Sequence, residues 1–211
     1  MTDPAATGTA TTDPATADTT MTDTATTDTR IRLLREEDWP EVIAAEERAY
    51  AASGLSEGGA ALRSRHRASP STCFVLEDAD GFAGYLLALP YPLFRCPDLS
   101  LASTGAAVRP TESNLHAHDL VIAERARGRG LAPRLLRHLE ETGRAAGHRT
   151  LSLVAVRGSE VLWAGLGYRA RPEIGLPASY GAAAVYMAKP LDRAPNPADP
   201  TPGSAPRAEV G

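Results

Sequence analysis

The stretch from residue 120 to residue 139 constrains the possible folds of this chain more than any other. It passes from the apolar residues 120–122 through Arg127-Gly128-Arg129-Gly130 into a helical pattern of leucines at positions 131, 135, 136 and 139. A strand that turns through glycines into a helix presents unpaired backbone N–H groups and the positive end of the helix dipole, and both attract an anion. Glycine also lets the backbone approach a phosphate without an intervening side chain. The sequence therefore predicts a binding site for a phosphorylated cofactor.

Two common phosphate-binding loops do not fit this segment. A Walker loop closes with Gly-Lys-Ser/Thr, which the chain lacks, and a Rossmann fingerprint places G-x-G-x-x-G near the start of a βαβ unit. Here the spacing is Arg127-x-x-Gly130-x-Ala132, and about half of the expected folded part precedes it. This spacing resembles the acetyl-CoA loop, Q/R-x-x-G-x-G/A, of the GNAT acetyltransferases.

The resemblance continues on both sides of the loop and covers roughly residues 30–192. Residues 118–122 resemble the family's fourth strand, 150–156 its fifth, 162–168 the end of its last helix and 184–191 its closing strand. It implies the GNAT fold, an α/β (α+β) arrangement in which a mixed, mostly antiparallel sheet of six to seven strands is flanked by about four helices. It also implies acetyl-CoA as the cosubstrate.

The domain organisation is predicted from composition. Residues 1–29 are almost wholly Thr, Ala, Asp, Pro and Gly, and residues 193–211 are rich in Pro and Ala. Neither end has enough large apolar side chains to offset the entropy of ordering, so both are predicted to be disordered tails around an acetyltransferase domain of residues 30–192. Because Met21-Thr22-Asp23 repeats Met1-Thr2-Asp3, a start at Met21 is one further hypothesis.

Charge and composition argue against several classes of partner. The formal net charge is −4, which does not favour nucleic acid, and no apolar run approaches the roughly 20 residues of a membrane span. Cys73 and Cys96 do not make a disulfide framework, and the N-terminus has no apolar signal-peptide core. We expect a cytoplasmic protein. A homodimer is an expectation by analogy with relatives alone.

The remaining pattern predicts elements on both sides of the loop. A strand is expected over residues 30–34, a helix after Asp38, a second helix over about 56–67, a hairpin over 73–89 and a last hairpin over 170–191. Residues 90–114 form a long connection, which we expect to contribute to the acceptor site. The basic run Arg63, Arg65, His66 and Arg67 is predicted to be a charged helix end rather than a grip for an acidic acceptor.

The resemblance assigns the cofactor site residue by residue. The backbone of strand residues 120–122 is expected to pair with the pantetheine arm, and the loop N–H groups are expected to hold the pyrophosphate. Arg127 and Arg129 are predicted phosphate contacts and Arg134 a ribose-phosphate contact, although a solvated basic face also explains the three arginines. The predicted cofactor-binding residues are Leu120, Val121, Ile122, Arg127, Gly128, Arg129, Gly130, Leu131, Ala132, Arg134 and Trp163.

Two histidines precede the loop, in His116-Ala117-His118-Asp119. Strand alternation predicts His116 and His118 on one face and Ala117 and Asp119 on the other. Imidazole titrates in the range needed to deprotonate an amine, and the His-x-His spacing resembles that of the serotonin (arylalkylamine) N-acetyltransferases, where both histidines act as bases through water. We predict His116 and His118 as catalytic and Asp119 as the alternative base. Partly buried structural histidines or a metal pair are alternatives, but no further metal ligands are evident.

The chain departs from the family pattern at two positions. Many members have a tyrosine in the last helix that protonates the leaving thiolate, and Trp163 stands there. Either Trp163 packs beside the sulfur, another group is the acid, or solvent is. Tyr168, Tyr180 and Tyr186 are candidates by residue type, although core or rim packing is favoured for them. The family's cofactor-binding Asn after the fifth strand is replaced by Arg157-Gly158-Ser159.

The resemblance predicts N-acetylation of a primary amine of a small molecule, by direct attack in a ternary complex, with a backbone N–H near Ile122 polarising the thioester. One alternative is acetylation of a protein N-terminus or lysine at a groove lined by Glu36, Glu37, Glu46 and Glu47, residues that a solvated helix face explains equally well. Another is a regulatory module that binds acyl-CoA without turnover.

Overall fold

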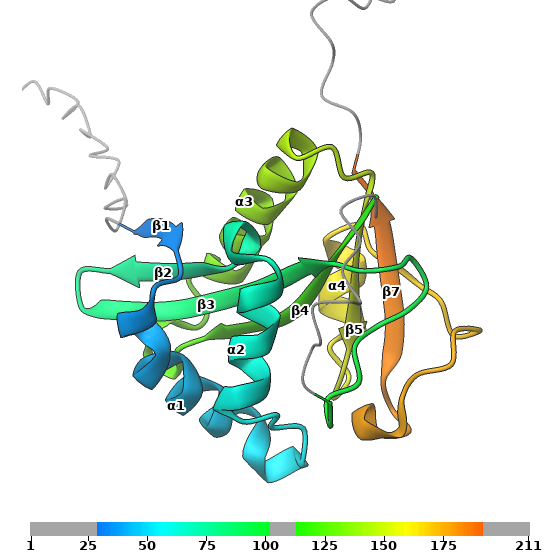
Figure 1. Cartoon of the computed structure of the whole chain (residues 1–211), viewed down its shortest axis with the longest axis horizontal. Helices are drawn as coiled ribbons and strands as arrows, with labels where there is room; N and C mark the ends of the chain where they lie inside the picture. Colours follow the sequence, from blue (N-terminus) through cyan, green and yellow to red (C-terminus); the bar gives the residue numbers. More distant parts are fainter. Residues whose placement is uncertain (1–28, 102–112, 192–211) are drawn as a thin grey trace, which may run out of the picture.

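A single seven-stranded sheet, in the order β1-β2-β3-β4-β5-β7-β6, forms the centre of the computed structural model, which describes residues 29–101 and 113–191 (Figure 1). Its strands are β1 (Arg30–Leu33), β2 (Phe74–Asp78), β3 (Gly81–Pro90), β4 (Asn114–Ile122), β5 (Thr150–Ala155), β6 (Arg169–Ala170) and β7 (Val185–Pro190). The β4–β5 pair is parallel and the other neighbouring pairs are antiparallel. The predicted fold class is therefore confirmed.

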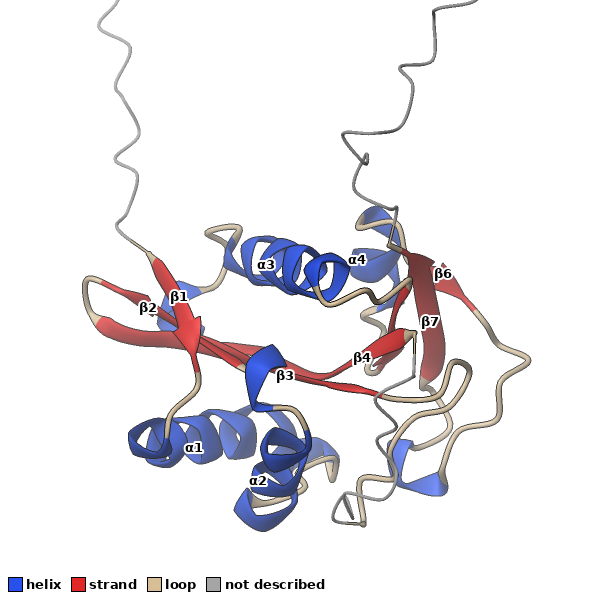
Figure 2. Cartoon of the chain, turned by 45° about the horizontal axis from the view of Figure 1, so that its top comes forward, coloured by secondary structure: helices blue, strands red, loops and turns tan. Residues whose placement is uncertain are grey.

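Helices cover both faces of the sheet (Figure 2). Helices α1 (Trp39–Tyr50) and α2 (Gly59–Ala68) lie on one face, and α3 (Leu131–Ala145) and α4 (Glu160–Gly165) lie on the other. One apolar cluster, with Trp39, Leu62 and Tyr85, fills the α1/α2 side, and a second, with Leu135 and Leu139, fills the α3 side. The second helix begins three residues later than predicted, so Glu57 lies in the segment that leads into it.

The two parallel strands separate along their length. β4 pairs with β5 only from Asn114 to His116, opposite Thr150 to Ser152, although β4 continues to Ile122 and β5 to Ala155. On its other side β4 stays paired with β3 as far as Ile122. Within the described residues, the second half of β4 thus has no strand partner on the β5 side. Such an edge can pair with an extended ligand as it would with another strand.

A β-bulge interrupts β4 at His118. Leu87 pairs with Asp119 and Ala88 with Ala117, so His118 is an extra residue in this strand. A bulge breaks the alternation of side chains, and here two consecutive side chains point to the α1/α2 side. Ala117 packs in the α3-side core, whereas Asp119 bonds to Tyr50 of α1. The prediction that Asp119 shares a face with Ala117 is therefore wrong, because it assumed a regular strand.

Several predictions fall outside the described residues. These are residues 1–28 of the N-terminal tail with Met21, residues 102–112 of the long connection, and the C-terminal tail. The domain boundaries stay predictions. Across the described residues, the helices are too short or too polar to cross a membrane.

Candidate active site

Three adjoining cavities lie where β4 and β5 diverge. The first, the β4–β5 cleft, has a volume of about 360 Å³ and extends to Trp163 of α4. The second, the arginine-lined cavity, has a volume of about 370 Å³ and follows residues 120–122 to Arg127. The third, the inner cavity, has a volume of about 50 Å³ and lies between α1 and the end of β4, next to Tyr180. Neighbouring cavities share lining residues, so the three together form one candidate site along the free edge of β4.

The loop before α3 has the backbone geometry of an anion site. Gly128 has a φ of 75° and Gly130 a φ of 70°, both in the left-handed region that favours glycine. Gly130 is the N-cap of α3, and no side chain caps the first N–H groups of the helix. A Cβ at either glycine would meet nothing within 4 Å, so glycine is required by the conformation rather than by space. Ala132 lines the β4–β5 cleft next to this loop, whereas Leu131 is buried in the core.

The three predicted phosphate arginines do not lie together. Arg127 lines the arginine-lined cavity. Arg129 instead donates to Asp78 at 2.7 Å, in an ion pair that Arg125 shares, and Arg134 donates to the carbonyl oxygen of Thr29 at 2.5 Å. The motif predicted these residues but not the directions of their side chains.

Sequence reasoning missed two other cations at this place, Arg48 of α1 and Arg157 after β5. Both line the arginine-lined cavity with Arg127. Arg157 has a φ of 57° and donates to the carbonyl oxygen of Ala49 at 2.7 Å, which ties the loop after β5 to the end of α1. Arg157 also lines the β4–β5 cleft, so its side chain lies at the boundary of the two larger cavities.

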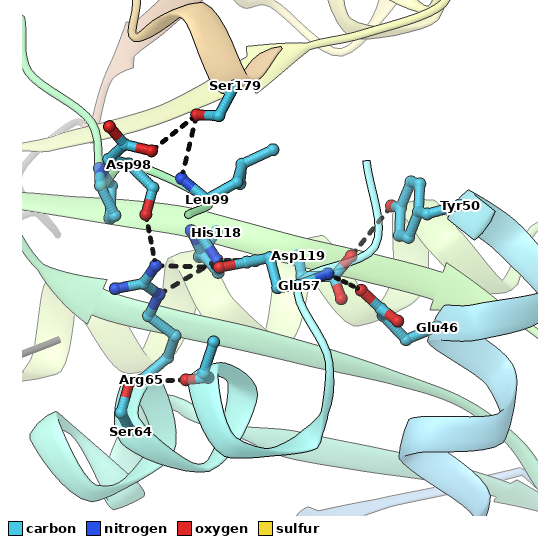
Figure 3. Close-up of polar contacts among 12 residues, drawn as sticks. Glu46, Tyr50, Glu57, Ser64, Arg65, Asp98, Leu99, His118, Asp119 and Ser179 are labelled. Carbon is cyan, nitrogen blue, oxygen red and sulfur yellow. Dashed lines mark hydrogen bonds and ion pairs between the residues drawn. The ribbon is translucent and has the colours of Figure 1, made fainter. Parts of the chain in front are cut away.

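His118 lies in a buried charged network with Glu57 and Arg65 on the α1/α2 side of the sheet (Figure 3). Its Nε2 is 2.5 Å from Glu57 Oε1, and the other oxygen of Glu57 accepts from Arg65 at 2.9 Å. Burial opposes the ionisation of Glu57, but His118 and Arg65 outweigh it and lower the pKa of this carboxyl. Nε2 also lies 3.4 Å from Arg65 Nε, but the carboxylate is the nearer partner. A proton on Nε2 satisfies this shorter contact and leaves the Nδ1 lone pair unused. Nδ1 is buried and has no hydrogen-bond partner within the described chain.

Asp119 is held between two tyrosines. The Tyr50 hydroxyl donates to Oδ1 at 2.9 Å and the Tyr85 hydroxyl donates to Oδ2. Burial raises the pKa of Asp119 to about 6, against the lowering effects of the Tyr85 hydrogen bond and the nearby His118. Asp119 lines both the inner cavity and the β4–β5 cleft. It therefore places a carboxyl with a raised pKa at the junction of these two cavities.

This raised pKa predicts a pH-dependent stability. Between about pH 4 and pH 6 the unfolded chain ionises Asp119 while the folded chain keeps the proton, so ionisation opposes folding as the pH rises. The unfolding free energy of the wild type should therefore fall by roughly 3 kcal/mol relative to that of Asp119→Asn across this range. Urea unfolding of both proteins at several pH values measures it. A difference that stays constant with pH would contradict the assignment.

His116 lies apart from these cavities, although its ring centroid is 6.2 Å from that of His118. It is fully buried, its Nδ1 is 2.9 Å from Ser152 Oγ, and its ring stacks on Tyr186 with an interplanar angle of 17°. Burial places its pKa well below the usual value, with His118 and Arg65 adding to the shift. The structure thus brings one histidine of the predicted pair to the cavities and places the other in the core.

The aromatic residues near the cleft differ in their hydrogen-bond partners and in their burial. The Trp163 indole N–H donates to Ser159 Oγ at 3.1 Å. Tyr168 is buried against Trp163, and the Tyr186 hydroxyl accepts from the backbone N–H of Phe94, so both are packing residues. Tyr180 lines the inner cavity but donates to the carbonyl oxygen of Pro97.

Tyr50, which sequence reasoning did not assign, lines all three cavities. The available signal was its spacing from Glu46, since residues four apart share a helix face. Glu46 is buried and accepts from Ser56 Oγ and from the N–H of Glu57, each at 2.7 Å. The other carboxylates that were predicted for an acidic groove, Glu36, Glu37 and Glu47, are exposed.

The basic run does lie at a helix end, since Arg65, His66 and Arg67 form the last turn of α2. The Arg65 side chain is nevertheless only 3% exposed and bonds to Glu57. Arg67 in the same helix is exposed. Among the described residues, no group of three or more His, Cys, Asp or Glu side chains is placed to hold a metal ion.

Comparisons with known proteins agree with this architecture. Residues 31–168 match the sequence model of the acetyltransferase (GNAT) family. A search of curated proteins found no match.

Solved structures with a similar fold include the GNAT-like decarboxylase GphF in complex with isobutyryl-CoA, with a TM-score of 0.63, 20% identity, and coverage of 77% of this chain and 100% of that one. Ard1 from Thermoplasma volcanium has a TM-score of 0.59 and 15% identity, covering 77% and 97%. N-acetylglutamate synthase from Neisseria gonorrhoeae, complexed with coenzyme A and N-acetyl-glutamate, has a TM-score of 0.57 and 18% identity, covering 78% and 35%. At these identities the likeness shows a shared fold.

Proposed function

Since the chain belongs to the GNAT acetyltransferase family, we propose that it transfers the acetyl group of acetyl-CoA to a primary amine of a small molecule, by direct attack in a ternary complex. Acetyl-CoA is the cosubstrate of an acetyltransferase of this family. One observation carries the amine proposal. The small inner cavity is lined by the carboxylates of Glu46, Glu57 and Asp119 and adjoins the cleft beside β4.

The cofactor fits along the free edge of β4. The pantetheine arm would pair with the backbone of residues 120–122, and the pyrophosphate would meet the uncapped N–H groups at the start of α3. Arg127 adds positive charge there, together with Arg48 and Arg157. We assign the phosphate contacts to these three arginines because they line the cavity, whereas Arg129 and Arg134 do not.

The inner cavity suits the ammonium group of the acceptor. Within the described residues, only Glu57 of its three carboxylates is paired with an arginine, Arg65, so the negative charge that remains favours a cation. A volume of about 50 Å³ holds an amino group and little else. The remainder of the acceptor would then extend away from this cavity, and the amine nitrogen would face the thioester in the cleft.

His118 is the proposed base and Glu57 its positioning residue. The ammonium group gives one proton to His118 Nδ1, because Nε2–H is held by Glu57. The neutral nitrogen then attacks the thioester carbonyl carbon, whose oxygen is polarised by a backbone N–H of β4 near Ile122. The nitrogen of the tetrahedral intermediate then loses its second proton, the C–S bond breaks, and CoA leaves with the electron pair of that bond on sulfur.

A panel of acceptors tests the proposal. CoA release would be followed with acetyl-CoA and arylalkylamines, polyamines, amino acids, aminoglycosides or short peptides, while calorimetry records acetyl-CoA binding. We expect turnover with one class of small amines. Turnover with peptides alone would establish protein acetylation instead. Binding of acetyl-CoA without turnover on any amine would contradict the proposal and support a regulatory acyl-CoA-binding module.

A further inference from the structure

Tyr50 is the described residue that lines all three cavities and also bonds to Asp119. We propose that Tyr50 protonates the departing CoA sulfur and that Asp119 passes it the proton. This inference rests on the proposed acetyl transfer. It supplies the acid that Trp163 cannot supply, since an indole N–H does not ionise and here donates to Ser159.

The position of Tyr50 fits this role. It is the last residue of α1, directly after Ala49, whose backbone carbonyl accepts a hydrogen bond from Arg157. Its hydroxyl lies 2.9 Å from Asp119 Oδ1, and Asp119 lines the cleft and the inner cavity with it. Figure 3 shows the Tyr50 hydroxyl directed at Asp119. In the proposed complex this phenol would lie between the amine nitrogen, which loses protons, and the sulfur, which gains one.

The protons balance across the reaction. The acceptor ammonium loses two protons when it becomes an amide. His118 takes the first and releases it to solvent. The ammonium of the tetrahedral intermediate gives the second to the Asp119 carboxylate. As the C–S bond breaks, Tyr50 gives its proton to the sulfur and takes the one held by Asp119, so both groups return to their starting states.

The electrostatics of the pair explain why neither group acts alone. Burial, and then the charge of Asp119, raises the pKa of Tyr50 well above its usual value, so the isolated phenol is a weak acid. Asp119 has a pKa of about 6 and accepts a proton readily near neutral pH. Once Asp119 is protonated, its charge no longer holds the Tyr50 proton. Tyr85 bonds to the other oxygen of Asp119 and keeps the carboxyl in place while Tyr50 turns to the sulfur.

Tyr85 provides a matched control, because it also donates to Asp119 but lines none of the three cavities. We expect Tyr50→Phe to lower kcat by about 10²-fold at saturating acetyl-CoA, with little change in its KM, and Tyr85→Phe to lower kcat by less than about tenfold. Equal losses would overturn the proposal, because they would mean that Tyr50 only holds Asp119. Asp119→Asn tests the relay independently. The double variant with Tyr50→Phe should lose no more than Asp119→Asn alone.

A second measurement needs no acceptor, so its result does not depend on the proposed amine chemistry. The thiol of enzyme-bound CoA is titrated by the ultraviolet absorption of its thiolate. A donor at the sulfur stabilises the thiolate, so Tyr50→Phe should raise the pKa of the bound thiol by about one pH unit or more. Tyr85→Phe should leave it as in the wild type. A bound thiol that titrates alike in all three proteins would overturn the assignment, even if amines are acetylated.

Discussion

His118→Ala is expected to lower kcat/KM for acetyl transfer by about 10²- to 10⁴-fold, while His116→Gln changes it only a few-fold. The reason is placement. His118 lines the inner cavity and has an available Nδ1, whereas His116 is buried between Ser152 and Tyr186 and lines none of the cavities. The role of base therefore belongs to one histidine of the pair.

The comparison requires that both variants fold and bind cofactor. Thermal unfolding and the dissociation constant of acetyl-CoA serve as controls, since His116→Gln disturbs a stacked core ring and His118→Ala leaves Glu57 with one partner fewer. CoA release would be measured with the best acceptor of the panel. Similar losses in both variants would restore the His-x-His pair as the base. Full activity of His118→Ala would transfer the role to Asp119 or to solvent.

Arg65→Met is expected to lower the unfolding free energy by ~3–5 kcal/mol, because it breaks a buried ion pair. Arg65 donates to Glu57 at 2.9 Å and to the carbonyl oxygens of Asp98 and Leu101 at 2.8 and 2.7 Å. Its removal leaves these buried acceptors without this donor and weakens the compensation of the Glu57 charge. The same loss would loosen the loop at residues 98–101 beside the inner cavity.

The next cation of α2 is the control. Arg67 is exposed, so Arg67→Met should change the unfolding free energy by no more than about 0.5 kcal/mol. Adding Glu57→Gln to Arg65→Met should recover part of the stability, because it removes the uncompensated buried charge. Urea unfolding at neutral pH measures all the variants. If Arg65→Met and Arg67→Met behaved alike, the network would have no special stabilising role.

The fold was predictable because its evidence is local in sequence. The apolar run at residues 120–122, the glycines of the loop and the spacing of the leucines in α3 each reflect the backbone geometry of a single element. The bulge at His118 was not predictable in this way, because it exists only in the pairing of β4 with β3. One extra residue was enough to reverse the predicted direction of Asp119.

The candidate site was predicted in part. The predicted cofactor-binding residues that line the cavities are Leu120, Val121, Ile122, Arg127, Ala132 and Trp163. Arginine side chains are long, however, and Arg129 and Arg134 bond to partners elsewhere. Glu57 lies 61 positions before His118, and Tyr50 lies 69 positions before Asp119. The spacing of apolar residues along the sequence describes single helices and strands, so it cannot predict contacts between residues this far apart. Trp163 shows that the usual tyrosine acid is missing from the last helix, but the sequence does not show which residue takes its role.

The separation of β4 from β5 has a mechanical consequence. The sheet consists of two parts, one with β1 to β4 and the other with β5, β7 and β6. Three residue pairs, from Asn114 to His116 of β4, join the two parts. An extended molecule that pairs with the remaining edge of β4 fills the space where the strands diverge and so connects the two parts of the sheet. The cosubstrate would then stabilise the sheet as well as react. The two parts of the sheet would move less relative to each other in the loaded form than in the empty form.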